Sequence, residues 1–553
     1  MPYIYSWDNQ TVDANNTPVL QKATKGVSNP ELSENWADGI SIYTMAMINY
    51  QRSFGLHGVS ALAGIERITG NGNSIYAYRK DFLTDAIDQL FAGSEEQWKN
   101  NGSAYQNARL SYLSRVNYNY KEKYLLEAVA RYDGSYIFPK NKRFGFFPSI
   151  SAGWRISEEE FWNDNIVFIE YMKLRASYGQ TGNDRINEYQ YLASYAFRAG
   201  SFITNTSEKN KAVYETKIPN ENITWEVANQ TNFGIDAAIL KGKMALEVDY
   251  FSYLRTGLLW NRNATVPATA GFTLPRENIG KSSNKGFDFK LTYNGEVSSF
   301  VYSVGINGLY AENKVVFIDE PSGLPEYQQA TGKPIPENIN NYQSNLYYVA
   351  DGIFKDQSEI DSKPHWNGAV PGDIIFKDMN NDGKIDASDR VYRTKSNFPK
   401  LNGGVNFRLK YKQFDLFVLF QGASGADKYI SIQGGDFANY LKDTYDDRWT
   451  PTNTNASKPR TITRTEAYWK SNSNTFFLYN TDYLRFKTFE IGYNLQPQFT
   501  NRIGLENVRF YLSGNNLFTY TPHLKDFDPE PNKQWGAGYP IQRIINTGIS
   551  VTF

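Results

Sequence analysis

Residues 109–120 read RLSYLSRVNYNY, and their side chains alternate strictly between two faces. One face is mainly apolar and aromatic: Leu110, Tyr112, Ser114, Val116, Tyr118 and Tyr120. The opposite face is polar: Arg109, Ser111, Arg115, Asn117 and Asn119. A period of two residues predicts a β-strand whose two faces meet different surroundings.

The same alternation recurs along the whole chain and predicts about fifteen strands. They are expected near residues 40–51, 56–66, 105–120, 123–132, 146–156, 171–179, 229–240, 243–254, 284–294, 299–311, 401–411, 413–421, 483–494, 507–519 and 541–553. No run of 18 apolar residues occurs, which excludes a transmembrane helix. Membrane-spanning strands remain compatible with this sequence, because only alternate residues of such a strand face lipid.

The connections between these strands fall into two classes. Short turns are expected at Lys121-Glu122, Lys241-Gly242 and Lys412 and near Gly295. Long polar loops alternate with them, at about 67–104, 180–228, 255–283, 312–400 and 422–482. This pattern predicts an all-β transmembrane antiparallel β-barrel with short periplasmic turns and long extracellular loops. The alternative is a large soluble all-β protein.

The parity of the strands has a further consequence. If long loops face outward, Phe553 lies on the periplasmic side and the strand at 40–51 runs inward. Residues 1–39 are then the remnant of an extracellular loop, and 40–553 form the C-terminal part of a barrel. An odd number of strands is expected to be missing upstream, and the sequence shows no plug domain.

Composition excludes several classes of function. The 58 basic and 58 acidic residues cancel, so no basic surface indicates nucleic-acid binding. There is no cysteine and there are only three scattered histidines, which argues against thiolate catalysis, zinc sites and a catalytic triad. Two groups of carboxylates are interpreted as solvated loop charges and not as a glycosidase pair: Asp443, Asp446, Asp447, and Glu158, Glu159, Glu160. No enzymatic activity is expected.

An acidic stretch at 378–389, DMNNDGKIDASD, has the oxygen spacing of a calcium loop. The predicted ligands are Asp378, Asn380, Asp382, Lys384 (through its carbonyl), Asp386 and Asp389, with Gly383 at the sharp turn. The last position is Asp, where Glu is usual. A structural Ca²⁺ is one interpretation, and an Asx- and Gly-rich turn that only caps a hairpin is the other. No cofactor is required by either.

Two more groups of residues are candidates for function. Four tryptophans in the long loops could stack on sugar rings, pack the loops or contact a partner: Trp366, Trp449, Trp469 and Trp535. The last strand carries Ile549, Val551 and Phe553 on one face, which is typical of a signal read by the outer-membrane assembly machinery. The alternative is a plain final strand with a lipid-facing Phe.

Several motifs resemble the SusC/RagA-like TonB-dependent transporters of bacterial outer membranes. They are KYLLEA (123–128) with RYDGS (131–135), FPSISAGWR (147–155), LRASYGQTGN (174–183), WE (225–226) with TNFG (231–234), PGD (371–373) ahead of 378–389, YLRFK (483–487), SGNNLF (513–518) and DPE (528–530). Together they span nearly the whole chain, in the order of the family.

The resemblance implies a 22-stranded barrel, of which about seven strands are absent here. It also implies a plug domain, contact with TonB through a segment that this chain lacks, and a SusD-like surface lipoprotein over the mouth. The implied function is import of a glycan or peptide ligand. Two alternatives are a soluble surface protein that binds or cleaves glycans, and a passive porin.

Overall fold

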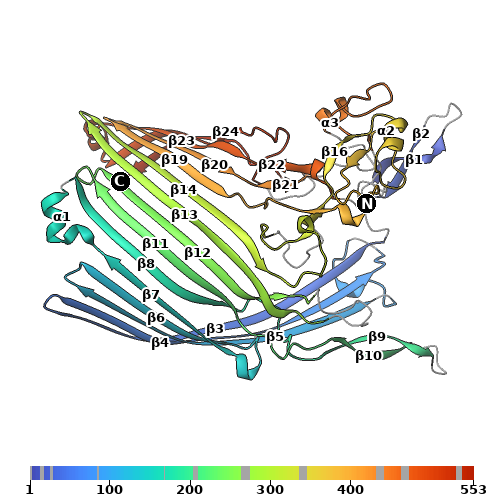
Figure 1. Cartoon of the computed structure of the whole chain (residues 1–553), viewed down its shortest axis with the longest axis horizontal. Coiled ribbons are helices and arrows are strands. Elements are labelled where there is room, and N and C mark those ends of the chain that lie inside the picture. Colours follow the sequence, from blue (N-terminus) through green and yellow to red (C-terminus); the bar gives the residue numbers. More distant parts are fainter. Residues whose placement is uncertain are drawn as a thin grey trace. The chain divides into compact units, whose positions relative to one another are not determined.

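A computed structural model describes residues 3–12, 18–24, 29–83, 86–96, 98–166, 168–203, 209–262, 274–335, 345–430, 441–461, 473–530 and 539–553. Its main feature is one 15-stranded sheet with the order β25-β24-β23-β20-β19-β14-β13-β12-β11-β8-β7-β6-β5-β4-β3 (Figure 1). Each of the ten neighbouring pairs from β7–β8 to β24–β25 is antiparallel. Every strand expected from the alternation is present.

The strands of this sheet are β3 (Glu31–Phe54), β4 (His57–Lys80), β5 (Lys99–Tyr120), β6 (Tyr124–Ser135), β7 (Phe144–Trp154), β8 (Ile169–Asn183), β11 (Glu226–Ile239), β12 (Met244–Trp260), β13 (Glu277–Val297), β14 (Phe300–Phe317), β19 (Leu401–Tyr411), β20 (Phe414–Ser424), β23 (Tyr483–Asn494), β24 (Asn507–Tyr520) and β25 (Ile544–Thr552). Among the described residues, five two-stranded sheets lie outside this sheet: β1 (Tyr3–Val12) with β2 (Pro18–Thr24), β9 (Ser194–Ile203) with β10 (Lys209–Lys217), β15 (Leu346–Tyr347) with β18 (Val391–Tyr392), β16 (Ala350–Ile353) with β17 (Ile374–Phe376), and β21 (Asp427–Tyr429) with β22 (Leu478–Asn480).

The helices are short: α1 (Glu160–Asn165), α2 (Gln357–Ser362), α3 (Lys442–Asp446) and α5 (Pro497–Thr500). Within the described residues, no helix is long and apolar enough to cross a membrane. The chain divides into two compact units. One takes in residues 1–48, 63–113 and 132–136, and the other takes in 49–62, 114–131 and 137–553.

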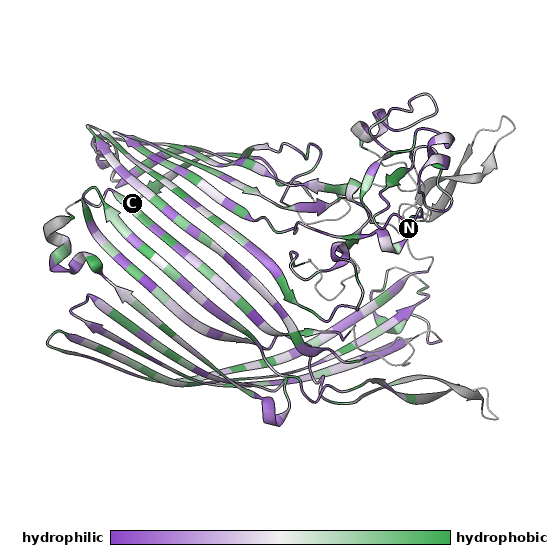
Figure 2. Ribbon diagram, in the orientation of Figure 1, coloured by the Kyte–Doolittle hydropathy of each residue, from purple (hydrophilic) through white to green (hydrophobic). Residues whose placement is uncertain are grey.

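The register of the strands keeps like side chains on the same face. Leu174 pairs with Ile235, which pairs with Val248, and Val248 pairs with Phe289 in β13. Such apolar residues alternate with polar ones along each strand (Figure 2). The apolar phase is exposed: Phe233, Ile150 and Tyr112 keep 55%, 51% and 45% of their accessible surface. These side chains therefore do not form a dry central core, as expected of lipid-facing residues.

Short turns lie where the alternation stops. Lys121 and Glu122 both adopt positive φ, 53° and 54°, which gives the tight hairpin turn between β5 and β6. Lys241 and Lys412 adopt similar values in their own turns. The turn expected near Gly295 is present and lies at Ser298-Ser299, because β13 continues to Val297.

Several strands are longer than the alternation indicated. β3 begins at Glu31, so residues 31–39 are extended sheet, although they were expected in a loop. β4 reaches Lys80 and β5 begins at Lys99, so the loop expected at 67–104 is confined to 81–98. These extensions are rich in glycine and polar residues, and their apolar residues do not keep to one face, as Ile68 and Ile75 show. No regular apolar period therefore marks them, although the hydrogen-bonded ladder continues.

The two faces of β19 allow a direct test of lipid exposure. Phe407→Arg is expected to destabilise the protein by about 2–4 kcal/mol, because Phe407 lies near the middle of this 11-residue strand on the apolar face. Asn406→Arg, on the opposite face, should change stability little. The measurement is guanidinium unfolding of the protein in lipid vesicles. Equal losses for the two variants would contradict the assignment of the faces.

Candidate functional site

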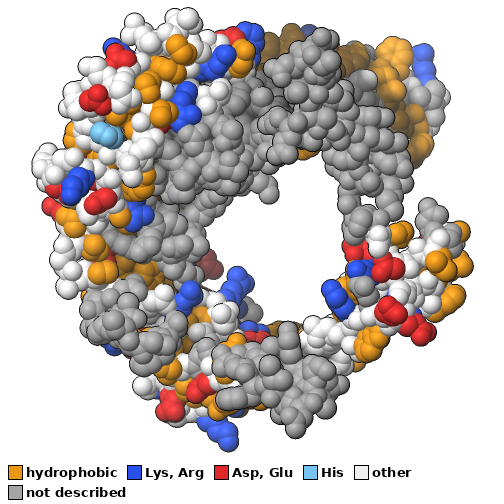
Figure 3. Space-filling model, turned by 90° about the vertical axis from the view of Figure 1, so that its right-hand side faces the viewer, with side chains coloured by type: hydrophobic (Ala, Val, Ile, Leu, Met, Phe, Trp, Pro, Cys, Tyr) orange, Lys and Arg blue, Asp and Glu red, His pale blue; other side chains and the backbone are white. Residues whose placement is uncertain are grey.

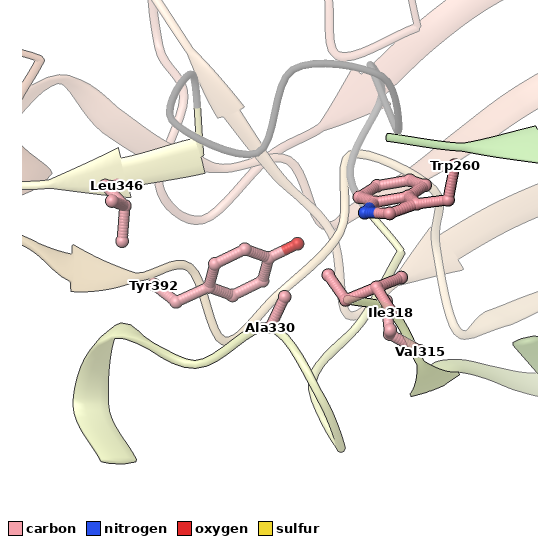
Figure 4. Packing of buried hydrophobic residues seen from close by; sticks show 6 residues of the cluster. All are labelled: Trp260, Val315, Ile318, Ala330, Leu346 and Tyr392. Atoms are coloured by element: carbon pink, nitrogen blue, oxygen red, sulfur yellow. The ribbon is translucent and has the colours of Figure 1, made fainter. Parts of the chain in front are cut away.

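The long-loop end of the sheet carries a compact group of loops. We call residues 318–335, 345–400, 426–430, 447–460 and 474–482 the loop cluster. On the described part of the face at this end of the molecule, basic and acidic side chains are interspersed with apolar ones (Figure 3). One of its hydrophobic cores joins the loops to the ends of β12 and β14. It contains Trp260, Val315, Ile318, Ala330, Leu346 and Tyr392, all at most 6% exposed (Figure 4).

A second core lies within the loops. It consists of Tyr348, Ile374, Phe376, Ile385 and Phe477, which come from two segments of the loop cluster, 345–400 and 474–482. The Tyr348 ring stacks on Phe376 with a centroid distance of 4.9 Å. Burial of these apolar side chains stabilises the loops without help from the membrane. The long loops are thus held by cores of their own.

A buried ion pair ties two of these segments together. The fully buried Asp373 carboxylate accepts a hydrogen bond from Arg460 Nε at 2.6 Å. It also accepts one from the backbone N–H of Val370 at 3.0 Å. The backbone N–H of Arg460 donates to the Gly372 carbonyl at 2.9 Å. Because a charge buried without its partner is costly, this pair fixes residues 447–460 against 354–373.

Two of the four candidate tryptophans, Trp366 and Trp449, lie among the described residues, and both pack the loops. Trp366 meets Tyr348 edge-on, with a centroid distance of 5.9 Å. Trp449 donates its indole N–H to the Lys355 carbonyl at 3.1 Å and lies so close over Gly372 that a Cβ there would overlap its ring. Trp469 and Trp535 lie outside the described residues. The packing interpretation accounts for the contacts of Trp366 and Trp449.

The acidic stretch at 378–389 folds as a chain of tight turns. Asp378 Oδ2 accepts from the Gly383 N–H at 2.8 Å, and Asp382 Oδ1 accepts from the Lys384 N–H at 2.9 Å. Gly383 has φ 80°, which glycine adopts without strain. Asp389 is fully buried and accepts from the backbone N–H groups of Met379 and Asp386, both at 2.8 Å.

Asp386 begins a short 3-10 turn at 387–389 and forms a capping box with Asp389. The backbone N–H of Ser388, which donates to Asp386, lowers the pKa of that carboxyl below its usual value. Most carboxylates of this loop therefore already accept hydrogen bonds from it. Asp378 Oδ1 differs, because it is buried and has no hydrogen-bond partner, and this fits a cation ligand.

Among the described residues, no three His, Cys, Asp or Glu side chains are gathered in an arrangement that could hold a metal. The predicted calcium set contains four aspartates, and in this structure no three of them are gathered in such an arrangement. Calcium binding by this loop stays a prediction.

The polar face of the sheet carries paired charges that the sequence analysis did not identify. Arg175 of β8 donates to both carboxylate oxygens of Asp236 (2.9 and 2.7 Å) and of Asp249 (2.9 and 2.8 Å). One guanidinium thus joins three neighbouring strands, β8, β11 and β12. Gly234 lies between them, and a Cβ there would come within 2.6 Å of Arg175 Cζ.

A second cluster repeats this arrangement. Arg509 of β24 contacts Asp415 of β20 and donates to Glu490 of β23 at 2.7 Å. A Cβ at Gly492 would overlap the Arg509 guanidinium, so glycine again makes room for arginine. Each charge lies on the polar phase of its strand, but only the strand register shows that the charges meet.

Two polar depressions adjoin these clusters. The first, about 460 Å³, is lined by polar-phase side chains that include Asn117, Asn119, Glu127, Lys173 and Asn232. The second, about 580 Å³, is lined by residues that include Arg408, Lys410, Asp415 and Glu490. These side chains supply hydrogen-bond donors, acceptors and both signs of charge, which suits a polar solute.

The remaining predicted residues lie apart from one another. Glu158 pairs with Arg155 at 2.8 Å, and Glu159 accepts from Tyr124 and Trp154. Asp446 pairs with Lys442, and Asp447 accepts from Ser457. Each of these four carboxylates has a partner, which lies at strand ends for Glu159 and nearby in the sequence for the others. On β25, Ile549 and Val551 are 62% and 40% exposed, and Phe553 follows at 91%. Their role in assembly stays a prediction.

Comparison with known proteins gives consistent similarities. Residues 3–517 match the family described as TonB dependent receptor-like, beta-barrel. The chain is 30% identical over 534 residues to TonB-dependent receptor P3 of Formosa agariphila, which covers 92% of this chain and 52% of that protein. It is 26% identical over 456 residues to TonB-dependent receptor SusC of Bacteroides thetaiotaomicron, which covers 81% of this chain and 44% of that protein.

Among solved structures, the fold is similar to that of the RagAB peptide transporter, with a TM-score of 0.74 at 22% identity. This match covers 95% of the chain and 56% of the transporter chain. The chain spans about half the length of the curated relatives it matches.

The charge cluster around Arg175 predicts unequal effects of two substitutions. Arg175→Met leaves Asp236 and Asp249 facing each other, and we expect a loss of about 1–2 kcal/mol because the side chain is partly exposed. Lys290→Met is the control, because its pair with Glu247 is more than half exposed on both sides. Guanidinium unfolding in vesicles measures both, and a similar effect of the two would contradict a special role for Arg175.

Calcium binding at 378–389 can be tested by calorimetry on the whole protein. We expect one calcium ion to bind with release or uptake of heat, and Asp382→Ala to abolish this signal because it removes a ligand. Asp351→Ala, an exposed carboxylate elsewhere in the loop cluster, should leave the signal unchanged. No heat above that of buffer at millimolar calcium would refute the site and leave the turn interpretation.

Proposed function

The chain belongs to the TonB-dependent receptor-like β-barrel family of the outer membrane, and from this we propose that it forms the wall of an importer for oligosaccharides or peptides. The family consists of transporters and is not enzymatic. The observation that supports the proposal best is the polar face of the sheet, with its paired charges and its two polar depressions. A solute that carries hydroxyl or amide groups can exchange its water hydrogen bonds for these side chains.

The loop cluster supports a proposal about the partner. Its buried cores hold a large loop surface in place at the long-loop end, and a preformed surface lowers the ordering cost of binding. We propose that a SusD-like lipoprotein docks on this surface. The RagAB transporter, to which the fold is similar, is described as a peptide importer.

Energy coupling through TonB is part of the same proposal, since it is the property that names the family. A passive porin would differ in one measurable respect, because its flux would not need the proton gradient. The alternative of a soluble glycan-binding or glycan-cleaving protein is not supported. The family is one of outer-membrane transporters, and the exposed apolar phase needs lipid around it.

The proposal is tested by uptake of labelled oligosaccharides and peptides into cells that lack the gene and carry it again on a plasmid. One of the two solute classes is expected to enter, and an uncoupler should stop its entry. Uptake that survives the uncoupler would favour the porin, and no uptake of either class would refute the proposed substrates.

Neighbouring residues on β5 provide matched variants for this assay. Asn117 lines the first polar depression, whereas Val116 is 47% exposed on the apolar face. Asn117→Leu should lower uptake about fivefold, which corresponds to one lost hydrogen bond. Val116→Leu should leave it unchanged. Surface levels of both variants are compared by labelling of intact cells.

A further inference from the structure

An apolar groove of about 780 Å³ lies on the lipid-facing phase of β5 to β8, β11 and β12. Ala152 and Ala176 lie between larger side chains, among them Trp154, Phe233 and Tyr250. Ala152 and Ala176 are directly paired across β7 and β8, so two small side chains adjoin. This pairing leaves a hollow that is bounded by Phe233 and Tyr250 in the same row and by Trp154 in the next.

The groove begins at the short-turn end of the sheet, which is the periplasmic end in outer-membrane barrels. Tyr124 is the first residue of β6 and Trp154 the last of β7, and both line the groove. Their rings stack at 6.5 Å with an interplanar angle of 11°. Such an aromatic row is typical of the level of the lipid headgroups. From this row the groove continues toward Phe233 and Tyr250, in the middle of their strands.

Both aromatic side chains at the rim point a polar atom at one carboxylate. Tyr124 Oη donates to Glu159 Oε1 at 2.7 Å, and Trp154 Nε1 donates to the same oxygen at 3.0 Å. Lys123 Nζ lies 3.7 Å from Glu159 Oε2. The groove therefore opens beside fixed polar groups, while its walls are almost entirely apolar.

The charged side chains near the rim form ion pairs. Arg155 contacts Glu158 at 2.8 Å and Glu122 at 3.6 Å, in addition to the pair of Lys123 with Glu159. Beside the opening, Glu159 and Lys123 thus offer one carboxylate and one ammonium group. A zwitterionic headgroup can place its ammonium on Glu159 and its phosphate on Lys123, whereas an anionic headgroup has no cation to place on the carboxylate. The rim favours the zwitterion.

We propose that this groove binds one acyl chain of a zwitterionic phospholipid of the phosphatidylethanolamine type from the periplasmic leaflet. The outer-membrane location of the protein places this face in lipid, so an acyl chain is the matching occupant for an apolar hollow. A methylene inside the groove makes van der Waals contacts on several sides, which a flat apolar surface cannot offer. The site does not depend on which solute is transported.

Lipid retention measured by native mass spectrometry tests the site. The protein is purified in detergent and titrated with dioleoyl-phosphatidylethanolamine or dioleoyl-phosphatidylglycerol. The double variant Ala152→Leu/Ala176→Leu fills the groove with apolar side chains that lipid-facing strands tolerate. Ala128→Leu, on the same face of β6 but outside the groove, is the control.

We expect one tightly held phosphatidylethanolamine. Its affinity should fall about tenfold in the double variant, which corresponds to the burial of about two methylene groups. The affinity of the control variant should not change. Phosphatidylglycerol should bind about fivefold more weakly than phosphatidylethanolamine. Equal binding of the two lipids would overturn the headgroup assignment.

Two other outcomes would overturn the groove itself. One is retention that is the same in the double variant as in the wild type. The other is a wild-type protein that is dimeric, holds no lipid and becomes monomeric in the double variant, which would make a second copy of the chain the occupant. Quenching of Trp154 fluorescence by phosphatidylethanolamine with brominated acyl chains, with Trp154→Phe as reference, reports the same site independently.

Discussion

The backbone hydrogen-bond ladder is the constraint on which the rest of the structure depends. Inside a bilayer there is no water to pair with peptide groups, so each strand must satisfy them through its neighbours. The ten consecutive antiparallel pairs from β7 to β25 meet this requirement with few register shifts. Once the ladder fixes the register, the side chains have only two directions available, toward lipid or toward the polar face.

The two faces then solve different problems. The lipid face needs only apolar surface, and alanine, leucine or tyrosine all serve, which is why a hollow can form there at Ala152 and Ala176. The polar face must balance charge across strands, and it does so with arginines that each contact two carboxylates. Gly234 and Gly492 lie next to these guanidinium groups, and a Cβ at either position would overlap the arginine.

Much of this fold could be predicted from the sequence, because the period of two is a local signal. The stretch at 109–120 shows it clearly, and all fifteen expected strands exist. The polar extensions of β3 and β4 carried no such signal. The pairing of Arg175 with Asp236 and Asp249 joins residues 61 and 74 positions apart, and only register brings them together. The packing of Trp366 and Trp449 also depends on contacts within the folded loops. The sequence alone therefore left the role of these two tryptophans open.

The separate cores of the loop cluster have a consequence for how such a protein changes over evolutionary time. Tyr348, Phe376 and Phe477 hold the loops through buried contacts, and Asp373 with Arg460 locks two segments together. The outward-facing positions of these loops carry little of that stabilisation. Mutations can therefore accumulate there without unfolding either the loops or the membrane wall. One scaffold can in this way acquire new surface specificities while its interior stays the same.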